Sequence, residues 1–327
     1  MAGDPFNPMD DSTSPFHAGE RELQARAGVR DRIEQIGRRV LRDHLIDQHQ
    51  EFFALLPTLI VSALDGTEQP WATMLAGPAG FVSAPDARRL QVKAVRSPQD
   101  PALAELTLGA PIGVLGLQAH TRRRNRLNGV VAALDASGFA IAVRQSFGNC
   151  PKYIQGREPE RCMATTETRA VHGGTTLDAD ARHLIANADT FFVASRSPAP
   201  KDSHQAQGLD VSHRGGKPGF VRIDDAHEAS VLTIPDFVGN DYFNTLGNLL
   251  LAPACGLLFV EYATGGLLHL AGDGELLWSG ADLEAYAGAQ RFWRFHVRAS
   301  VWRPGVLPYR WTAPDLSPQL VETGNWP

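Results

Sequence analysis

The chain has 327 residues, of which 43% are hydrophobic and 20% are charged, and its net charge at pH 7 is −5. This length suits two domains of roughly 100–200 residues each, and the composition is ordinary for a globular protein. A negative net charge argues against general nucleic-acid binding, because that function needs a basic surface. We therefore expect no nucleic-acid partner.

The cysteines and the first residues of the chain bear on its compartment. Cys150, Cys162 and Cys255 are odd in number and lack the spacing of metal ligands, which favours a reducing environment and predicts no metal site. Residues 1–5 lack the features of a secretory signal. The most apolar stretch, 246–270, is interrupted by charged and proline residues, which argues against a transmembrane helix. We expect a cytoplasmic protein without membrane association.

The N-terminal part of the chain predicts helices. Residues 1–13 are polar and acidic and show no periodic apolar pattern. Between residues 20 and 56, apolar residues recur with a period near 3.6, and Pro57 ends the pattern. This predicts a tail and an amphipathic helical lead-in over residues 1–56, which we expect to pack onto the first of two β-rich units.

The first β-rich unit is expected over residues 57–160. A helix is expected near 101–108, and Asn128-Gly129 interrupts one strand in the manner of a bulge. Short strands with turn residues between them predict a small antiparallel barrel. The predicted strands are 58–63, 71–74, 81–84, 90–94, 112–117, 127–134 and 139–143.

A connection is expected over residues 161–187, and it contains a helical run at 178–187. The second β-rich unit then covers residues 188–327, with a helix at 241–251 and a long closing strand from Arg291. Its other predicted strands are 190–195, 219–224, 230–234, 255–262, 266–271 and 274–278.

The two units repeat one another in sequence. Similar segments recur in the same order, with an offset that drifts slowly from 139 to 143 residues. We therefore predict a tandem duplication, in which two copies form an intramolecular version of a dimer interface. The matching pairs are 77–82 with 216–221, 111–115 with 253–257, and 127–129 with 270–272.

The second unit carries the densest set of polar residues. The segment 210–220 contains Ser212 and Arg214 beside two glycines, and we interpret it as a loop whose donors suit a bound phosphate. The stretch 240–248 places small polar groups at the start of a helix, where the dipole also favours an anion. The alternative is a pair of glycine turns and an N-capped helix, with Asp236 as a cap or turn residue.

The first unit carries different polar features. The segment 120–126 is strongly basic, and its alternative interpretation is a solvated hairpin tip. Pro151 disfavours a continuing central strand, so the backbone is expected to turn and to present Lys152 and Tyr153. Cys150 is either a nucleophile beside Lys152 or a buried structural residue. The motifs Gly-x-Ser-x-Gly, Walker A and Gly-x-Gly-x-x-Gly are missing, which disfavours hydrolase, NTPase and dinucleotide-fold interpretations.

Several of these segments together resemble a known family. The order Gly-x-Pro-Gly-Phe-Val, Ile-Pro-Asp-x-x-Gly-Asn, Thr-Leu-x-Asn-Leu and Pro-x-x-Gly-Leu-Leu-Phe is similar to that of FMN-binding split-barrel proteins related to pyridoxamine 5′-phosphate oxidase. The segments 149–154 and 14–20 also resemble double-barrel members, and the resemblance covers roughly residues 14–280. The four motifs lie at 216–221, 234–240, 245–249 and 253–259.

The resemblance implies a mainly β (α+β) fold of two tandem six-stranded Greek-key split β-barrels, with an N-terminal helical segment and FMN in the groove between the barrels. It implies a primary cofactor surface on the second barrel and a second set of residues reaching the cofactor from the first barrel. The first set is Ser212, Arg214, Lys217, Arg222, Pro235, Asp236, Asn240 and Asn248, and the second set is Arg124, Asn128, Lys152 and Tyr153.

The chain also departs from the pattern of the oxidase itself. The Arg-rich strand and the Arg-Lys pair of that enzyme are not evident, and neither is its terminal Arg-x-His pattern, although 295–298 lies in a comparable tail. This argues against pyridoxal phosphate synthesis. The first unit has Ser97-Pro98-Gln99-Asp100 in place of Pro-Asp-x-x-Gly-Asn, so we expect one intact flavin site per duplicated pair.

Two functions remain open from the sequence. The first is an FMN-dependent oxidoreductase that passes electrons from NAD(P)H to a small substrate or partner, with Arg214 or Lys152 as a donor near the ring and Tyr153 or Trp293 as its wall. The second is a non-enzymatic protein that binds, stores or senses a flavin, a deazaflavin or haem, because one fold hosts many functions. Pairing of two chains into a homodimer is compatible with both.

Overall fold

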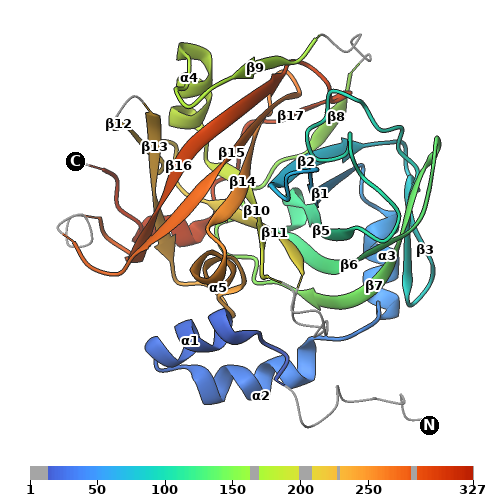
Figure 1. Cartoon of the computed structure of the whole chain (residues 1–327), viewed down its shortest axis with the longest axis horizontal. Coiled ribbons are helices and arrows are strands. Elements are labelled where there is room, and N and C mark those ends of the chain that lie inside the picture. Colours follow the sequence, from blue (N-terminus) through green and yellow to red (C-terminus); the bar gives the residue numbers. More distant parts are fainter. Residues whose placement is uncertain (1–13, 163–168, 199–207, 227–228, 281–285, 327) are drawn as a thin grey trace.

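The computed structural model describes residues 14–162, 169–198, 208–226, 229–280 and 286–326. Within these residues the fold is mainly β, with two large antiparallel sheets and five α-helices. Figure 1 shows the sheets packed side by side, with α1 (Ala18–Arg26) and α2 (Arg30–Val40) beneath α5 (Asn244–Leu251). In the described part of the chain, no helix combines the length and apolar character needed to cross a membrane.

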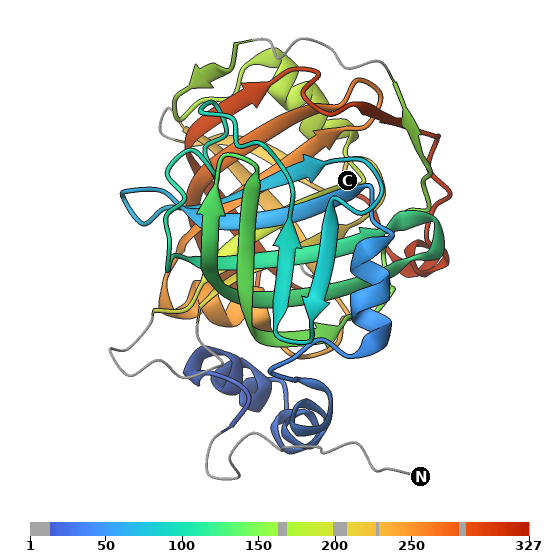
Figure 2. The same cartoon turned by 90° about the vertical axis from the view of Figure 1, so that its right-hand side faces the viewer.

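The first sheet contains seven strands in the order β2-β1-β5-β6-β7-β4-β3, and Figure 2 presents this part of the molecule to the viewer. The path is open, since β2 and β3 are its ends among the described residues. The strands are β1 (Thr58–Leu64), β2 (Pro70–Ala76), β3 (Val82–Asp86), β4 (Arg89–Val92), β5 (Pro111–Gln118), β6 (Arg123–Asp135) and β7 (Gly138–Gly148).

The second sheet has the order β11-β10-β14-β15-β16-β13-β12, which repeats that of the first sheet strand for strand. The segment predicted as a connection supplies α4 (Ala179–Asn187) and β9 (Val171–Gly173), which pairs with β16. Strand β8 (Pro159–Arg161), at the end of the first predicted unit, pairs with β17 (Tyr309–Trp311). The strands are β10 (Thr190–Arg196), β11 (Leu209–Gly215), β12 (Arg222–Ala226), β13 (Ala229–Phe237), β14 (Ala254–Glu261), β15 (Gly266–Leu277) and β16 (Ala289–Arg303).

Equivalent glycines allow each sheet to approach the other closely. A Cβ at Gly113 of β5 would lie 2.7 Å from the carbonyl oxygen of Leu209, and a Cβ at Gly256 of β14 would lie 2.3 Å from that of Pro70. Each contact joins one sheet to the first residue of an edge strand in the other. The two halves therefore meet through reciprocal contacts that only glycine permits.

The two sheets have equivalent bulges and separate cores. The register shifts between Asn128 and Gly129 in β6, as the sequence predicted, and between Ala271 and Gly272 in β15. One apolar cluster fills each half, and a third joins the two sheets. Strands β1 and β10 are buried along almost their entire length, because they lie in the middle of the molecule and contact neighbours on both faces.

The helical lead-in differs from the expectation in where it packs. It forms three helices, and α3 (Asp47–Ala54) lies near β3 of the first sheet, as expected. Helix α1, however, packs on α5 of the second half, where a Cβ at Gly19 would lie 2.1 Å from the carbonyl oxygen of Gly247. An apolar periodicity predicts a helix but not its partner, so this contact could not be read from the pattern.

Three other local predictions were wrong. Residues 101–108 form turns rather than a helix, and the predicted strands 266–271 and 274–278 are one continuous β15. The segment 209–215, interpreted as a loop, is strand β11, because its polar side chains alternate with buried apolar ones. Each sheet path also contains seven strands where six had been expected, and neither is a closed barrel in the described residues.

Candidate functional site

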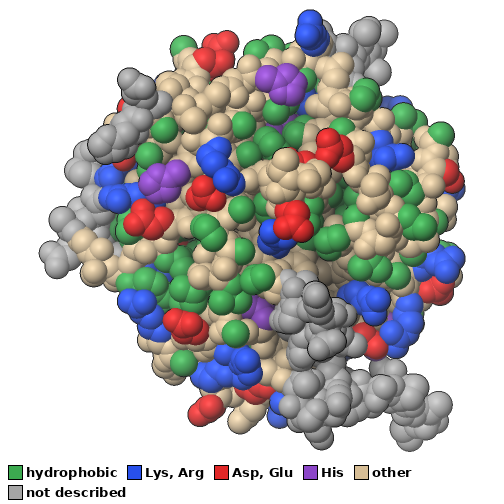
Figure 3. Space-filling model, viewed as in Figure 1, with side chains coloured by type: hydrophobic (Ala, Val, Ile, Leu, Met, Phe, Trp, Pro, Cys, Tyr) green, Lys and Arg blue, Asp and Glu red, His purple; other side chains and the backbone are tan. Residues whose placement is uncertain are grey.

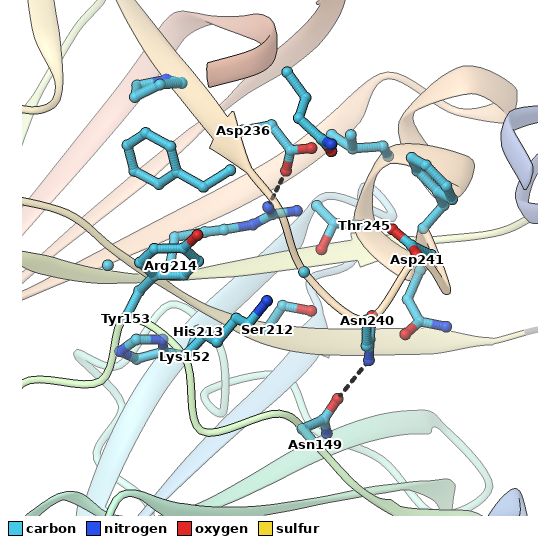
Figure 4. Close-up of a pocket in the computed structure, with 18 of the residues that line it drawn as sticks. Asn149, Lys152, Tyr153, Ser212, His213, Arg214, Asp236, Asn240, Asp241 and Thr245 are labelled. Carbon is cyan, nitrogen blue, oxygen red and sulfur yellow. Dashed lines mark hydrogen bonds and ion pairs between the residues drawn. The ribbon is translucent and has the colours of Figure 1, made fainter. Parts of the chain in front are cut away.

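A pocket of about 120 Å³ lies where β6 of the first sheet faces β11, the end of β13 and the start of α5. Figure 4 shows its polar side chains converging from these elements, with Lys152 and Tyr153 entering from the segment after β7. On the molecular face in Figure 3, basic and acidic side chains are interspersed, so the gathering of cations in the pocket is a local feature.

The second sheet contributes a charged wall. Ser212 and Arg214 point to the same side of β11 because alternate residues of a strand share a face. Arg214 donates to one carboxylate oxygen of Asp236, and Arg291 of β16 donates to the other over 3.1 Å. Arg291 also lies over the ring of Phe243, with its guanidinium carbon 4.8 Å from the ring centroid. Asp236 thus holds two guanidinium groups at one end of the pocket.

The first sheet contributes Arg124 and Arg126, which share a face of β6. Arg126 donates to the hydroxyl of Ser212 and, over 3.3 Å, to Asp210. Arg124 donates only to main-chain carbonyls, those of Cys150 (2.8 Å) and His213 (3.4 Å). Among the described residues Arg124 has no carboxylate partner, although its side chain is partly buried.

The start of α5 forms a third side of the pocket. Its N-cap residue, Phe243, provides no side-chain hydrogen bond to the first turn, so main-chain N–H groups of that turn remain available to a ligand. Phe243 (φ 63°), Asp241 (φ 61°) and Tyr153 (φ 62°) all line the pocket in the left-handed region of backbone space. Such strain in non-glycine residues costs energy and tends to collect at ligand sites.

The pocket has an excess of positive charge. Its lining holds five cationic side chains and two carboxylates, an excess of three positive charges. Burial, followed by the neighbouring Arg126 and Arg214, lowers the pKa of Arg124 to about 10. Burial also lowers the pKa of Arg126 and Arg291. These groups therefore repel one another in a poorly solvated space, and a bound anion would relieve that repulsion.

Several donors in the pocket are also unused. In the part of the chain that the structure describes, buried side-chain nitrogens of Arg126, Arg214, Arg291 and Asn149 have no hydrogen-bond partner. Asn149 accepts a hydrogen bond from Asn240 over 3.4 Å, which leaves its own amide N–H groups free (Figure 4). Unsatisfied buried donors are costly, so this arrangement suits a ligand rich in acceptor oxygens.

The structure brings together eight of the twelve residues predicted for the site, and all of them line the pocket. Two thirds of the candidate set thus meets at one place although its members come from distant parts of the chain. The eight are Arg124, Lys152, Tyr153, Ser212, Arg214, Pro235, Asp236 and Asn240.

The other four candidates lie outside the pocket lining. Lys217 donates to the carbonyl of Thr323, and Arg222 lies over the ring of Trp326. Asn248 donates to Ser195 of β10 and to Asp210 of β11 in a buried network. Asn128 donates to Asp210 and Gln145 in the same region. Their predicted contact with the cofactor stays a prediction, because the pocket lining does not include them.

Sequence reasoning also missed residues that line the pocket, above all Arg126, Arg291 and Asn149. The alternation of Arg124 and Arg126 within the basic segment was a signal for a shared strand face. Arg291 gave no signal, because it begins a long strand in which charged and aromatic residues alternate as they do on solvated strands. Only the fold brings its guanidinium to Asp236.

Aromatic residues border the pocket on the side of Tyr153. The Tyr153 ring lies 5.2 Å from that of Phe237, and Phe237 continues into a cluster with Tyr286 and Phe292. Trp293, also considered as a wall for a ring, is fully buried in the core of the second half and lies outside the pocket lining. Tyr153 and Phe237 thus form the aromatic border on this side of the pocket, while Phe220 and Phe243 line it elsewhere.

No known family model matches the chain, and no curated protein matches it. Solved structures with local similarity include HupZ of Group A Streptococcus (TM-score 0.28, 14% identity, covering 38% of this chain and 90% of that one). Others are an FAD-binding protein from Mesorhizobium loti (0.25, 14%, 41% and 97%) and a putative 5-nitroimidazole antibiotic resistance protein from Bacteroides thetaiotaomicron (0.24, 10%, 42% and 92%). These TM-scores are too low to support a functional assignment, so the interpretation of the site depends on its own geometry.

Proposed function

We propose that the pocket binds FMN and that the chain is an FMN-dependent oxidoreductase built from two tandem Greek-key split barrels. The observation that carries this proposal is Arg124, a partly buried guanidinium whose pKa is lowered to about 10 and which has no carboxylate partner among the described residues. A phosphate monoester would supply the missing charge, since guanidinium and phosphate form strong charge-assisted hydrogen bonds.

The residues present fit such a group. Acceptor oxygens would meet the guanidinium groups of Arg126 and Arg214, which line the pocket, and the uncapped first turn of α5. The cavity of about 120 Å³ is somewhat smaller than the roughly 150 Å³ that holds a benzene molecule, so it would enclose a phosphate with a small part of the chain attached to it. The rest of the cofactor has to lie outside this volume, and Tyr153 and Phe237 offer aromatic surface there.

We assign the following roles to the chain's own side chains. Arg124, Arg126 and Ser212 hold the phosphate, and Asp236 keeps Arg214 and Arg291 in place by binding both. Arg214 or Lys152 offers a donor to the edge of the ring, where positive charge favours the reduced anionic form. When bound, FMN supplies the electron-transfer chemistry, and the protein supplies binding, orientation and electrostatics.

We also propose that each chain has one such site, with NAD(P)H as electron donor and a small molecule or protein as acceptor. The repeated strand order and the reciprocal glycine contacts support a tandem duplication. Positions equivalent to Arg124 and Arg214 in the other half are Leu267 and Leu75, which supply no charge.

The first experiment is the visible spectrum of the purified protein, with chromatography of any molecule released on denaturation. Flavin absorbance with FMN in the supernatant supports the proposal, and its bleaching by NADH or NADPH supports the oxidoreductase. A flavin that no nicotinamide cofactor reduces would favour a flavin-binding protein without that activity. A Soret band would point to haem, a released deazaflavin to that cofactor, and failure to bind added FMN would overturn the proposal.

A further inference from the structure

Residues 239–246, which we call the rim segment, form one side of the pocket. All of them except Tyr242 line it, and they include the uncapped first turn of α5. Figure 4 shows Asn240, Asp241 and Thr245 along this side. The groups that this side offers to a ligand are therefore placed by the backbone conformation of one short segment.

The rim segment has a backbone conformation that its own sequence does not favour. Asp241 (φ 61°) and Phe243 (φ 63°) both lie in the left-handed region. This region is uncommon for non-glycine residues and is strained for a bulky one such as phenylalanine. Such a conformation persists only where the surrounding structure holds it, so contacts from outside the segment are needed.

Helix α1 supplies such a contact through Gln24. The side chain of Gln24 is fully buried, and its Nε2 donates to the carbonyl oxygen of Tyr242 over 3.2 Å. Tyr242 stands between the two left-handed residues, so this bond holds the peptide group that joins Tyr242 to Phe243. The side-chain oxygen of Gln24 accepts from Arg30 over 2.8 Å, which sets the direction of the amide.

Other contacts from the N-terminal part of the chain hold the same segment. The ring of Tyr242 packs against Phe16 and Phe147, with 5.5 and 5.9 Å between the ring centroids. Arg32 of α2 forms an ion pair with Asp241 over 2.7 Å. No described residue of α1 or α2 lines the pocket itself. The two helices therefore contact the pocket only through the residues that form its side.

We propose that Gln24, assisted by Arg32, is a positioning residue for the anion site. Without touching the ligand, Gln24 holds the rim segment in the conformation that presents the first turn of α5 to the phosphate. This inference rests on the proposed function of the pocket. Ligand-binding groups need support from surrounding hydrogen bonds and packing, because a small displacement weakens their contacts. The contribution of Arg32 is the smaller one, since its ion pair is partly exposed.

Gln24→Met tests this role, because it removes the donor and keeps a side chain of similar length. Fluorescence titration should show FMN binding about three- to tenfold more weakly. At saturating FMN, the phosphorus-31 chemical shift of the bound phosphate should differ from that in the wild type. Phe53→Leu, in the core of the first half, controls for lost stability and should keep the wild-type affinity and shift. Wild-type values in Gln24→Met, or equal changes in both variants, would overturn the proposal.

A second pair of variants applies even if Gln24→Met does not fold. Arg32→Glu places a carboxylate beside Asp241 and should weaken FMN binding about threefold. Arg38→Glu changes the net charge of α2 equally, but Arg38 pairs with Glu34 of the same helix, so FMN affinity should stay near that of the wild type. Equal affinities in these two variants would refute the positioning role. Failure of the wild-type protein to bind FMN would instead overturn the proposed function.

Discussion

Arg126 of β6 and His269 of β15 occupy equivalent positions, each paired across its ladder with a leucine of the preceding strand. Each also reaches into the opposite half. Arg126 donates to Ser212 on β11, and a ring nitrogen of His269 lies 2.9 Å from the carbonyl oxygen of Ala72 on β2. One position in a shared framework thus makes a charged contact in one half and a neutral one in the other.

Charged residues in one half and apolar residues in the other also occupy equivalent positions of β11 and β2. Where β11 has Asp210 and Arg214, β2 has Trp71 and Leu75, as the strand registers show. Around β2, the region equivalent to the pocket is filled by apolar side chains and by a buried ion pair between Arg303 and Asp100. The comparison teaches that glycines and apolar alternation set the strand framework, while a few inward-facing positions decide whether a pocket forms.

The largest effect is expected from Arg303→Met in the filled half. Arg303 donates to Asp100 over 2.6 Å, and both side chains are almost fully buried. Removing the guanidinium leaves a buried carboxylate without its ion-pair partner, which typically costs about 3–5 kcal/mol. Denaturant unfolding should show this loss, with FMN affinity of the remaining folded protein unchanged. A loss of unfolding free energy below about 1 kcal/mol would show that the ion pair does not stabilise this half.

Arg124→Leu, which copies the equivalent Leu267, should separate binding from stability. Loss of charge-assisted hydrogen bonds is expected to weaken FMN binding about tenfold to a hundredfold. Stability should stay the same or rise, because a partly buried cation without a carboxylate partner is replaced by an apolar group. Fluorescence titration and thermal melting measure the two effects. Arg88→Leu, at an exposed ion pair far from the pocket, is the control. A parallel fall in both quantities would contradict this role.

The bulge glycines test whether the two halves share one framework. A Cβ at Gly129 would lie 2.2 Å from the carbonyl oxygen of Ala142, and a Cβ at Gly272 would lie 2.1 Å from that of His296. Gly129→Ala and Gly272→Ala should therefore each destabilise the protein by about 1–3 kcal/mol, and by similar amounts. Unfolding midpoints of the two variants give the comparison. A difference of several kcal/mol would show that the bulges are not equivalent.

The sequence predicted the framework better than the site for a physical reason. Gly77 and Gly216 each allow an aromatic ring, Phe81 or Phe220, to pack where a Cβ would otherwise stand, so the repeat is visible in the residues themselves. The eight candidate residues that meet in the pocket were predicted from the family resemblance, together with the polar segments that contain most of them. Arg291 did not, since its role depends on reaching Asp236 across a strand ladder and not on its neighbours in sequence.

The N-terminal helix shows the same limit. Its apolar period predicted a helix, but its place on α5 depends on the meeting of Gly19 with Gly247 and on Glu20, which accepts hydrogen bonds from Asn244 and from the main-chain N–H of His17. The first half has turns at residues 101–108 in place of α5, so this docked helix belongs to the half that contains the pocket. Its attachment is therefore a further difference between the halves.

Glu20 makes that attachment sensitive to pH. Burial, followed by the nearby Asp210, raises its pKa from 4.5 to about 8, while burial lowers the pKa of His17 from 6.5 to about 4. The contribution of Glu20 is complete at low pH and is lost as the pH rises toward 8. That of His17 is present above pH 6.5 and is lost as the pH falls toward 4. Below pH 6.5 the two groups change the free energy of unfolding in opposite directions as the pH varies. Between pH 6.5 and 8 only the Glu20 contribution changes with pH.

We therefore expect the free energy of unfolding to fall between pH 6.5 and 8, by up to about 1.4 kcal/mol per pH unit. Glu20→Gln keeps an acceptor for the N–H of His17 and removes the titrating group, so the slope should disappear in this interval. Glu22→Gln, at an exposed position of the same helix, should retain it. Denaturant unfolding at half-unit steps of pH measures the slope. An identical slope in both variants would show that Glu20 is ionised in the folded protein, and that α1 is held to the second half by packing of Gly19 on Gly247 rather than by a protonated carboxyl group.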